Sequence, residues 1–282
     1  MLSTLFICAI LIITSFGKAN AEKVLVNIWD GTEWEKIDVL FSAGELPNAE
    51  SVDPDLFHLT CNRKRFPGCG CDGCRMRTAT KPQHATMLTG VLADVHGVYS
   101  NICYQLIPDG LTVYEKIENK DGSIKTAHIS SKPKNFGEST FGNIIEDVDF
   151  FWAEDKPAPV AAANQARRLI RKWHGEDFFI VCHFTQPDTK GHKHGVDSIK
   201  YWQAILNCDS ELGRILDRLA EYGILEETKI YVLSDHGFGT PKPRGHGNAP
   251  NTFIISNDMN MRRDIYMREV AGILLENFGL YP

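Results

Sequence analysis

The stretch DFFIVCHFTQPDTKGHKHG, residues 177–195, contains the pattern from which the fold of this chain is predicted. Its first nine residues are nearly all apolar, and a short apolar run of this length is typical of a buried strand. Asp188 and His192 follow directly beyond this run. Ionisable residues just past the carboxyl end of a buried strand are typical of α/β proteins, in which ligands bind at that edge of the sheet.

Other segments repeat this alternation of strand and helix. Strand-like apolar runs are KVLVNIW (23–29), KIYVLS (229–234) and TFIIS (252–256). Helical patterns are predicted for residues 82–90, 159–174, about 196–222 and 261–277. Strands that alternate with helices predict a three-layer α/β/α fold with a mostly parallel central sheet. Within a small insertion at about 101–158, YEKIENKDGSIKTAHI (114–129) alternates around Asp121-Gly122 and predicts a hairpin.

The composition is that of an ordinary globular protein, with 282 residues, 43% of them hydrophobic. This length suffices for one sizeable core, and we expect residues 22–282 to form a single domain. The net charge is −6, from 30 Lys and Arg against 36 Asp and Glu. Because nucleic-acid-binding domains carry a basic face, this charge argues against a nucleic-acid partner.

The amino terminus, MLSTLFICAILIITSFGKANAEK, predicts a signal peptide over residues 1–21. The apolar run from Leu5 to Phe16 is too short to span a bilayer comfortably, and Ala19-Asn20-Ala21 is a small-x-small cleavage pattern. We therefore expect an exported protein, periplasmic or secreted, with no membrane span after cleavage. No basic residue precedes the apolar run, so an uncleaved membrane anchor stays open as the alternative.

Seven cysteines follow the predicted signal peptide, and four of them lie close together: Cys61, Cys69, Cys71 and Cys74. In an exported protein such a group favours disulfides. A zinc knuckle is the alternative, although the spacing fits no standard pattern well. Cys182, inside the apolar run at 177–185, is predicted to be a core residue.

Carboxylates and imidazoles stand beside every predicted strand of the core. Asp30 follows the first strand, Asp188 and His192 the second, and Asp235 and His236 the third, while His246 precedes the fourth. These groups are expected to converge on one edge of the sheet. Three aspartates and three histidines suit two divalent cations; the ligand types favour zinc, with manganese as the alternative.

A threonine nucleophile would use these cations. In TATKPQHATMLTG (78–90), Thr80 stands two residues before Pro82, at a predicted helix start. The free backbone N–H groups of a helix start suit an anion. A helix-capping role is the simpler interpretation of Thr80, but bound cations would lower the pKa of its hydroxyl and make it a nucleophile.

Together these residues resemble the alkaline-phosphatase superfamily, and within it the type I phosphodiesterase/nucleotide pyrophosphatase branch. The nucleophile motif matches at Thr80-Lys81-Pro82-Gln83-His84 through Thr89-Gly90, and the phosphate-binding asparagine at His96-Gly97-Val98-Tyr99-Ser100-Asn101. Two ligand motifs match at Pro187-Asp188-Thr189-Lys190-Gly191-His192-Lys193-His194-Gly195 and Ser234-Asp235-His236-Gly237. The resemblance covers the chain from Lys23 to about Ser256.

The resemblance implies a two-metal phosphoester hydrolase with an alkaline-phosphatase-like catalytic domain. One metal would be held by Asp188, His192 and His246. The other would be held by Asp30, Asp235 and His236, with Thr80 Oγ bridging toward it. Asn101 and backbone N–H groups near Thr80 would hold phosphate oxygens of a small-molecule substrate, and the reaction would pass through a phosphothreonine that water hydrolyses.

Two departures from the branch pattern leave the substrate open. Nine residues separate His236 from His246, where the branch usually has a long segment, and Lys81 stands where an aromatic residue is frequent. A phosphomonoesterase or a phosphosugar mutase of the same superfamily is therefore an alternative, as is a non-catalytic metal- or phosphate-binding protein. A sulfatase is disfavoured because Thr80 and His84 replace the required Cys or Ser and Arg.

Overall fold

The computed structural model describes residues 22–63, 76–239, 245–246, 249 and 251–280. Within these residues the strands form one eight-stranded sheet in the order β4-β3-β5-β1-β6-β7-β2-β8. Their bounds are β1 Lys23–Trp29, β2 Phe57–Thr60, β3 Lys125–Ser130, β4 Phe150–Ala153, β5 Phe178–Phe184, β6 Thr228–Leu233, β7 Asn251–Ser256 and β8 Ile265–Tyr266. The predicted signal peptide and Cys69, Cys71 and Cys74 lie outside the described residues.

The sheet is mostly parallel, as predicted. β1 pairs in parallel with β5 and β6, and β3 pairs in parallel with β4 and β5. β7 differs, because it runs antiparallel to both of its neighbours, β6 and β2. The start of β7 therefore lies at the same edge of the sheet as the carboxyl ends of the central parallel strands.

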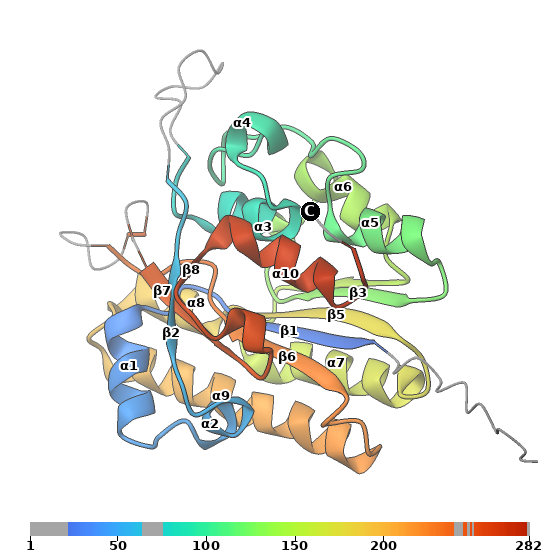
Figure 1. Ribbon diagram of the computed structural model, residues 1–282. Helices are drawn as coiled ribbons and strands as arrows, with labels where there is room; N and C mark the ends of the chain where they lie inside the picture. Colours follow the sequence, from blue (N-terminus) through green and yellow to red (C-terminus); the bar gives the residue numbers. More distant parts are fainter. Residues whose placement is uncertain (1–21, 64–75, 240–244, 247–248, 250, 281–282) are drawn as a thin grey trace, which may run out of the picture.

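Helices cover both faces of the sheet, which confirms the three-layer prediction (Figure 1). α7 and α9 lie against one face, and α3, α5 and α10 lie against the other (Figure 1). The helices are α1 Trp34–Ser42, α2 Pro47–Val52, α3 Thr80–Thr89, α4 Ala93–His96, α5 Val113–Lys120, α6 Glu138–Glu146, α7 Pro159–Trp173, α8 Gln186–His194, α9 Ile199–Glu221 and α10 Val270–Glu276, with 3₁₀ turns η1 Pro133–Asn135, η2 Met259–Met261 and η3 Met267–Glu269.

The two hydrophobic cores are divided by the alternation of side chains along the central strands. On β1, Leu25 and Trp29 belong to the core that contains α7 and α9, whereas Val24, Val26 and Ile28 belong to the core that contains α3, α5 and α10. Successive side chains of a strand point to opposite faces, so a strand covered on both faces is mostly apolar. Each such buried aliphatic side chain contributes about 1.5–3 kcal/mol.

The hairpin predicted for residues 114–129 is wrong. Its first half is α5, and its second half is β3, which extends the central sheet in parallel with β5. The helix begins at a capping box in which Thr112 accepts a hydrogen bond from the Glu115 N–H and the Glu115 carboxylate accepts one from the Thr112 N–H. The spacing Thr-x-x-Glu is a helix-start signal that outweighed the Asp-Gly turn signal.

Two other boundaries also differ from the sequence predictions. The helix expected over 261–277 is shorter, because β8, η3 and α10 share that range. The segment after β5 was treated as a loop but is the helix α8. The helices expected at 82–90, 159–174 and 196–222 are confirmed as α3, α7 and α9.

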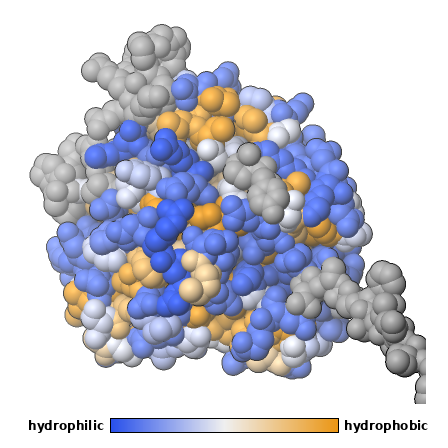
Figure 2. Space-filling view, viewed as in Figure 1, coloured by the Kyte–Doolittle hydropathy of each residue, from blue (hydrophilic) through white to orange (hydrophobic). Residues whose placement is uncertain are grey.

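The visible surface is mainly hydrophilic, with a hydrophobic patch over α4 (Figure 2). Val95 of α4 and Ile102, which follows it, are 50% and 91% exposed. Among the described residues, the structure contains no helix with the length and apolar character needed to cross a bilayer.

Candidate metal centre and active site

Three aspartates meet at one edge of the sheet because they follow three adjacent parallel strands. Asp30 follows β1, Asp235 follows β6, and Asp188 lies near the start of α8, just beyond β5. β1 lies between β5 and β6, and its last residue, Trp29, is aligned with Phe184 at the end of β5. The Asp188 N–H donates a hydrogen bond to the Asp30 carbonyl at 2.9 Å, which fixes the two backbones against each other.

One predicted ligand set, Asp188, His192 and His246, forms what we call the outer cluster. Asp188 and His192 are four residues apart on α8 and so share one face of the helix, with His192 Nε2 3.2 Å from Asp188 Oδ1. His246 Nε2 lies 3.9 Å from the same oxygen. His246 reaches this edge because it precedes β7, the reversed strand.

A glycine in the ligand motif allows a ring to support this cluster. A Cβ atom at Gly191 would lie 2.4 Å from the Phe238 ring, so a larger residue would displace that ring. Phe238 packs edge-on against His192, with 5.2 Å between the ring centroids. The absence of a side chain at Gly191 therefore lets the Phe238 ring pack against His192 and fix its position.

The second predicted set, Asp30, Asp235 and His236, forms the inner cluster, in which all three side chains are fully buried. His236 Nε2 lies 3.4 Å from Asp30 Oδ1 and 3.5 Å from Asp235 Oδ2. The same nitrogen is 3.4 Å from Thr80 Oγ1. The structure thus brings the predicted nucleophile to the inner cluster.

Two of the three cluster histidines are each oriented by a backbone carbonyl. His236 Nδ1 lies 3.1 Å from the Gly237 oxygen, and His246 Nδ1 lies 2.9 Å from the Thr78 oxygen. These contacts assign the proton to Nδ1, which leaves the lone pair of Nε2 facing the cluster. Second-shell hydrogen bonds of this kind are typical of metal-ligating histidines.

The unpaired oxygen atoms provide a test of whether these residues fit cations. Asp30 Oδ1, Asp188 Oδ1 and Asp235 Oδ2 are buried and make no hydrogen bond. An unsatisfied buried polar atom costs about 1–3 kcal/mol, and more for a charged group. Each of these oxygens faces the histidines of a cluster, so a divalent cation in each cluster would satisfy all three.

The start of α3 places the nucleophile beside the predicted phosphate-binding amide. Thr80 is the first residue of α3 and is fully buried. The Lys81 N–H donates to Asn101 Oδ1 at 2.9 Å, so Asn101 is held at this helix start. Because the oxygen of the amide is occupied by Lys81, its NH₂ group is the part that can bind a phosphate oxygen.

The three carboxylates differ in their proton affinity. Burial raises the pKa of Asp30 and Asp188, but Lys132 and the neighbouring histidines, His183 at Asp30 and His192 at Asp188, together outweigh it and hold the pKa of both below the usual range. The pKa of Asp235 is well above its usual value because of burial and the nearby charge of Asp30. Cation binding by Asp235 would therefore compete with a proton.

Lys132 is the site residue that sequence reasoning missed. Its Nζ donates to Asp30 Oδ2 at 2.8 Å, to Asp188 Oδ2 at 2.7 Å and to Thr80 Oγ1 at 3.1 Å. Lys132 stands two residues beyond the carboxyl end of β3. The rule that identified Asp30 would have identified it too, had β3 been predicted as a strand of the central sheet.

A buried histidine pair lies behind the inner cluster. His84, His183 and Asp235 form a third group whose ligand atoms lie within 4.8 Å of one another. His183 Nδ1 contacts Ser130 Oγ at 2.9 Å, and its Nε2 lies 3.2 Å from Asp30 Oδ2. The contacts of His183 with these two side chains are those of a group that positions Asp30.

The prediction that Cys61 takes part in a disulfide is wrong. Cys61 is a free, buried thiol, and its Sγ lies 3.5 Å from the Asp235 carbonyl oxygen. Burial raises its pKa, so it stays protonated. Cys182 is a free core residue, as predicted, whereas Cys103 is disulfide-bonded.

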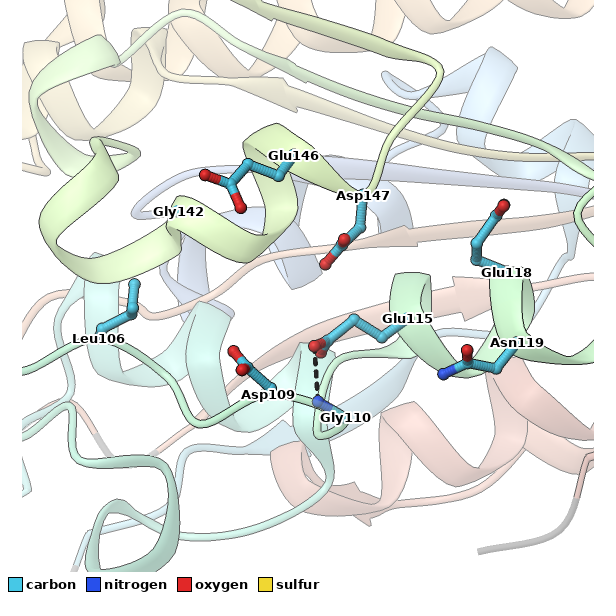
Figure 3. A pocket seen from close by; sticks show the side chains of 9 residues that line it. All are labelled: Leu106, Asp109, Gly110, Glu115, Glu118, Asn119, Gly142, Glu146 and Asp147. Atoms are coloured by element: carbon cyan, nitrogen blue, oxygen red, sulfur yellow. Dashed lines mark hydrogen bonds between the residues drawn. The ribbon is translucent and has the colours of Figure 1, made fainter.

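A separate acidic pocket of about 530 Å³ lies between α5 and α6 (Figure 3). Asp109, Glu115, Glu146 and Asp147 are among its lining residues, and none of the predicted site residues lines it. The Glu115 carboxylate accepts a hydrogen bond there from the Gly110 N–H, at 2.6 Å. This pocket is therefore distinct from the two clusters.

The fold and the two clusters together define a class: α/β proteins whose sheet edge presents paired Asp/His sites beside a helix-start hydroxyl. Residues 141–276 match the family described as type I phosphodiesterase / nucleotide pyrophosphatase. This range includes the ligands Asp188, His192, Asp235, His236 and His246.

Three related proteins have low sequence identity to this chain, but their alignments cover most of it. GPI ethanolamine phosphate transferase 1 of Schizosaccharomyces pombe is 22% identical over 84% of this chain. Ectonucleotide pyrophosphatase/phosphodiesterase family member 7 of Rattus norvegicus is 23% identical over 79%, and a venom phosphodiesterase of Crotalus durissus collilineatus is 23% identical over 70%. The chain spans 27%, 51% and 25% of the lengths of these three relatives.

Solved structures share the fold. The alkaline phosphatase of the Antarctic bacterium TAB5 superposes with a TM-score of 0.61 at 13% identity, over 93% of this chain and 99% of that one. A 2-O GAG sulfatase superposes with a TM-score of 0.68 at 11% identity, over 93% of this chain and 71% of that one. These structures show that the chain has an alkaline-phosphatase-like α/β fold, and residues 141–276 are similar to the type I phosphodiesterase / nucleotide pyrophosphatase family.

Proposed function

We propose that this chain hydrolyses phosphoesters with Thr80 as the nucleophile, and that phosphodiesters are its better substrates. The observation that carries this proposal is the position of Thr80 Oγ1, 3.4 Å from His236 Nε2 at the inner cluster. The N-cap residue of α3 is Ala79, so the Thr80 hydroxyl does not stand at the position from which a side chain caps a helix.

The clusters are proposed to bind two divalent cations, zinc or manganese. Asp188, His192 and His246 would hold one ion, and Asp30, Asp235 and His236 would hold the other, with Thr80 beside it. Once bound, the ions supply Lewis-acid stabilisation of negative charge on oxygen. The protein's own contribution is to hold the ligand atoms, the nucleophile and the substrate in one geometry.

The reaction proceeds in two displacements at phosphorus. Thr80 Oγ loses its proton to water and forms a bond to phosphorus, while the bond from phosphorus to the leaving oxygen breaks and that oxygen takes a proton from water. Water then attacks phosphorus, the Oγ–phosphorus bond breaks, and Thr80 regains a proton. The amide NH₂ of Asn101 and the N–H groups at the start of α3 hold the non-bridging oxygens.

The preference for diesters rests on Asn101. An amide is a neutral donor, and a diester carries one negative charge fewer than a monoester dianion. A site built for the dianion would gain from a cation at this position, because hydrogen bonds from charged donors to phosphate are stronger. Lys81 does not supply it, since its Nζ lies 3.3 Å from Thr140 Oγ1 and 3.3 Å from the centre of the Tyr104 ring.

The test is a comparison of a chromogenic phosphodiester with the matching phosphomonoester, with metal content measured on the same sample. We expect about two metal ions per chain and a higher kcat/KM for the diester. A much higher kcat/KM for the monoester would show that the chain is a phosphomonoesterase. Absence of any turnover by the fully loaded protein would favour a non-catalytic metal-binding role.

Three further expectations belong to this proposal. Residues 22–282 act as one catalytic unit, and the substrate is a small-molecule phosphoester. The protein is exported, an expectation supported by the predicted signal peptide and by the venom and ecto-enzyme names of two relatives. Amino-terminal sequencing of the mature protein would distinguish cleavage after Ala21 from a retained anchor.

A further inference from the structure

Lys132 occupies the space between the two clusters. Its side chain is 14% exposed, and its Nζ touches one carboxylate of each cluster, Asp30 at 2.8 Å and Asp188 at 2.7 Å. Lys132 follows β3 and directly precedes η1, and its own N–H donates to Ser130 Oγ at 3.1 Å. The chain therefore brings this cation to the site from outside both ligand motifs.

The two oxygens of each shared carboxylate are divided between different partners. Lys132 takes Oδ2 of Asp30 and Oδ2 of Asp188. The Oδ1 atoms of both residues face the cluster histidines and make no hydrogen bond. The ammonium group therefore leaves one oxygen of each carboxylate, Oδ1, free for a metal ion in the cluster.

The third contact of Lys132 is with the nucleophile. Its Nζ lies 3.1 Å from Thr80 Oγ1, which is hydrogen-bond distance for an ammonium donor. Lys81, the neighbour of Thr80 in sequence, is directed instead to Thr140 and the Tyr104 ring. The cation that reaches the nucleophile is therefore the one 52 positions away along the chain.

We propose that Lys132 is a catalytic residue: its ammonium group stabilises the negative charge that develops on Thr80 Oγ when the threonine attacks phosphorus. This inference rests on the proposed function. Lys132 keeps its three protons throughout, and the proton of Thr80 still goes to water. A fixed, partly buried cation beside a developing alkoxide acts before the reaction begins and needs no rearrangement during it.

Lys132 would make the same contacts with Asp30 and Asp188 if its role were purely structural. The experiment must therefore distinguish the effect of its positive charge from the effect of the hydrogen bonds that link the two carboxylates. Lys132→Gln retains a hydrogen-bond donor between the carboxylates and removes the charge. Lys132→Met removes both, and Lys132→Arg retains charge and donors. Lys23→Met is the matched control, because Lys23 is also a buried lysine paired with a carboxylate, Glu227 at 3.4 Å, at the opposite end of β1.

The first measurement is single-turnover phosphorylation of Thr80 by the metal-loaded enzyme. We expect Lys132→Gln and Lys132→Met to slow this step by about 10²–10³-fold, the scale of one lost donor to a developing charge. KM should change little, and Lys132→Arg should stay within about tenfold of the wild type. Lys23→Met should match the wild type.

The second measurement is metal affinity, which does not depend on turnover. Removing a positive charge from between two cation sites lowers electrostatic repulsion, so Lys132→Gln should bind zinc as tightly as the wild type or more tightly. If Lys132 only held the ligands in place, zinc affinity would fall in Lys132→Met and much less in Lys132→Gln, which keeps a donor, and activity would fall in proportion to the lost metal.

Three results would overturn the inference. They are weaker zinc binding that accounts for the lost activity, a fully loaded Lys132→Gln with wild-type phosphorylation, and a fully loaded Lys132→Arg as slow as Lys132→Gln. If the neutral variants do not fold, Lys132→Arg decides the question by itself, because a fully loaded Lys132→Arg slowed by about 10²-fold or more would overturn the inference. Absence of phosphoester turnover in the loaded wild type would overturn the proposed function as well, whereas the three results above leave it intact.

Discussion

The inner and outer clusters use the same kinds of ligand in very different surroundings. Asp30, Asp235 and His236 are fully buried at the ends of central strands. In the outer cluster, the His192 side chain is 43% exposed and the His246 side chain is 13% exposed. The inner cluster therefore holds Thr80, the proposed nucleophile, in fully buried surroundings, and the outer cluster is the more accessible to solvent.

The largest expected effect concerns the residue that makes the inner cluster reactive. Thr80→Ala should lower turnover by more than about three powers of ten, or ~4 kcal/mol, because it removes the proposed nucleophile. Both clusters keep their other ligands, so metal content should stay near that of the wild type. Steady-state kinetics and metal analysis of one sample provide the test, and near-normal activity would exclude a covalent mechanism through Thr80.

The next effect tests whether the inner cluster also orients the substrate. Asn101→Ala should raise the barrier by ~2–4 kcal/mol, the scale of one lost oxyanion donor. Asn101→Asp is the matched variant, since it retains an acceptor for the Lys81 N–H but loses the donor to phosphate. Both variants should lose kcat/KM for the diester; if Asn101→Asp is fully active, the amide donor has no role in binding phosphate.

The outer cluster can be tested separately through His246. His246→Ala should reduce bound metal from about two ions per chain to about one, because each site depends on three protein ligands. His194→Ala is the control: His194 lies on α8 two residues beyond His192 and outside the cluster. Equal metal content in the His246 and His194 variants would contradict the assignment of His246 as a ligand.

The smallest effect concerns stability behind the inner cluster. Burial, followed by the charge of Glu35, raises the pKa of Glu33 to about 7, and Glu33 Oε2 makes no hydrogen bond. A raised pKa in the folded state means that stability is complete at about pH 4.5 and is lost as the pH rises through 7. Glu33→Gln removes this loss.

Because Glu33 is only partly buried, solvent screening reduces the effect to about 1 kcal/mol. At pH 8 the Glu33→Gln variant should therefore be more stable than the wild type by this amount, and near pH 4.5 the two should be equal. Thermal unfolding at both pH values tests the prediction. A variant whose advantage is the same at both values would show that Glu33 does not titrate in this range.

The central strands and their terminal aspartates were predictable from sequence because each is a local pattern. An apolar run such as 178–184 is already a strand by composition, and Asp188 stands directly beyond it. The assignment of Asp188 and His192 to one face of α8 was missed, although their four-residue spacing is itself a helical signal.

The role of Lys132 and the direction of β7 could not be predicted from local sequence patterns, because both depend on which strands pair. Lys132 is informative only once β3 is known to pair with β5, and an Asp-Gly pair nearby favoured a hairpin instead. The direction of β7 depends on its partners β6 and β2, which are distant in sequence. Long-range pairing of this kind decides which side chains meet, and periodicity alone does not specify it.

The reversal of β7 also bears on how such a site diversifies. Because β7 is antiparallel to β6, the connection that carries His246 leaves and rejoins the sheet at one edge. Segments of different length could be accommodated there without changing the register of any strand. A library of grafted segments between His236 and His246 would therefore be a direct way to search for new substrate ranges, with the proposed nucleophile Thr80 and Lys132 left unchanged.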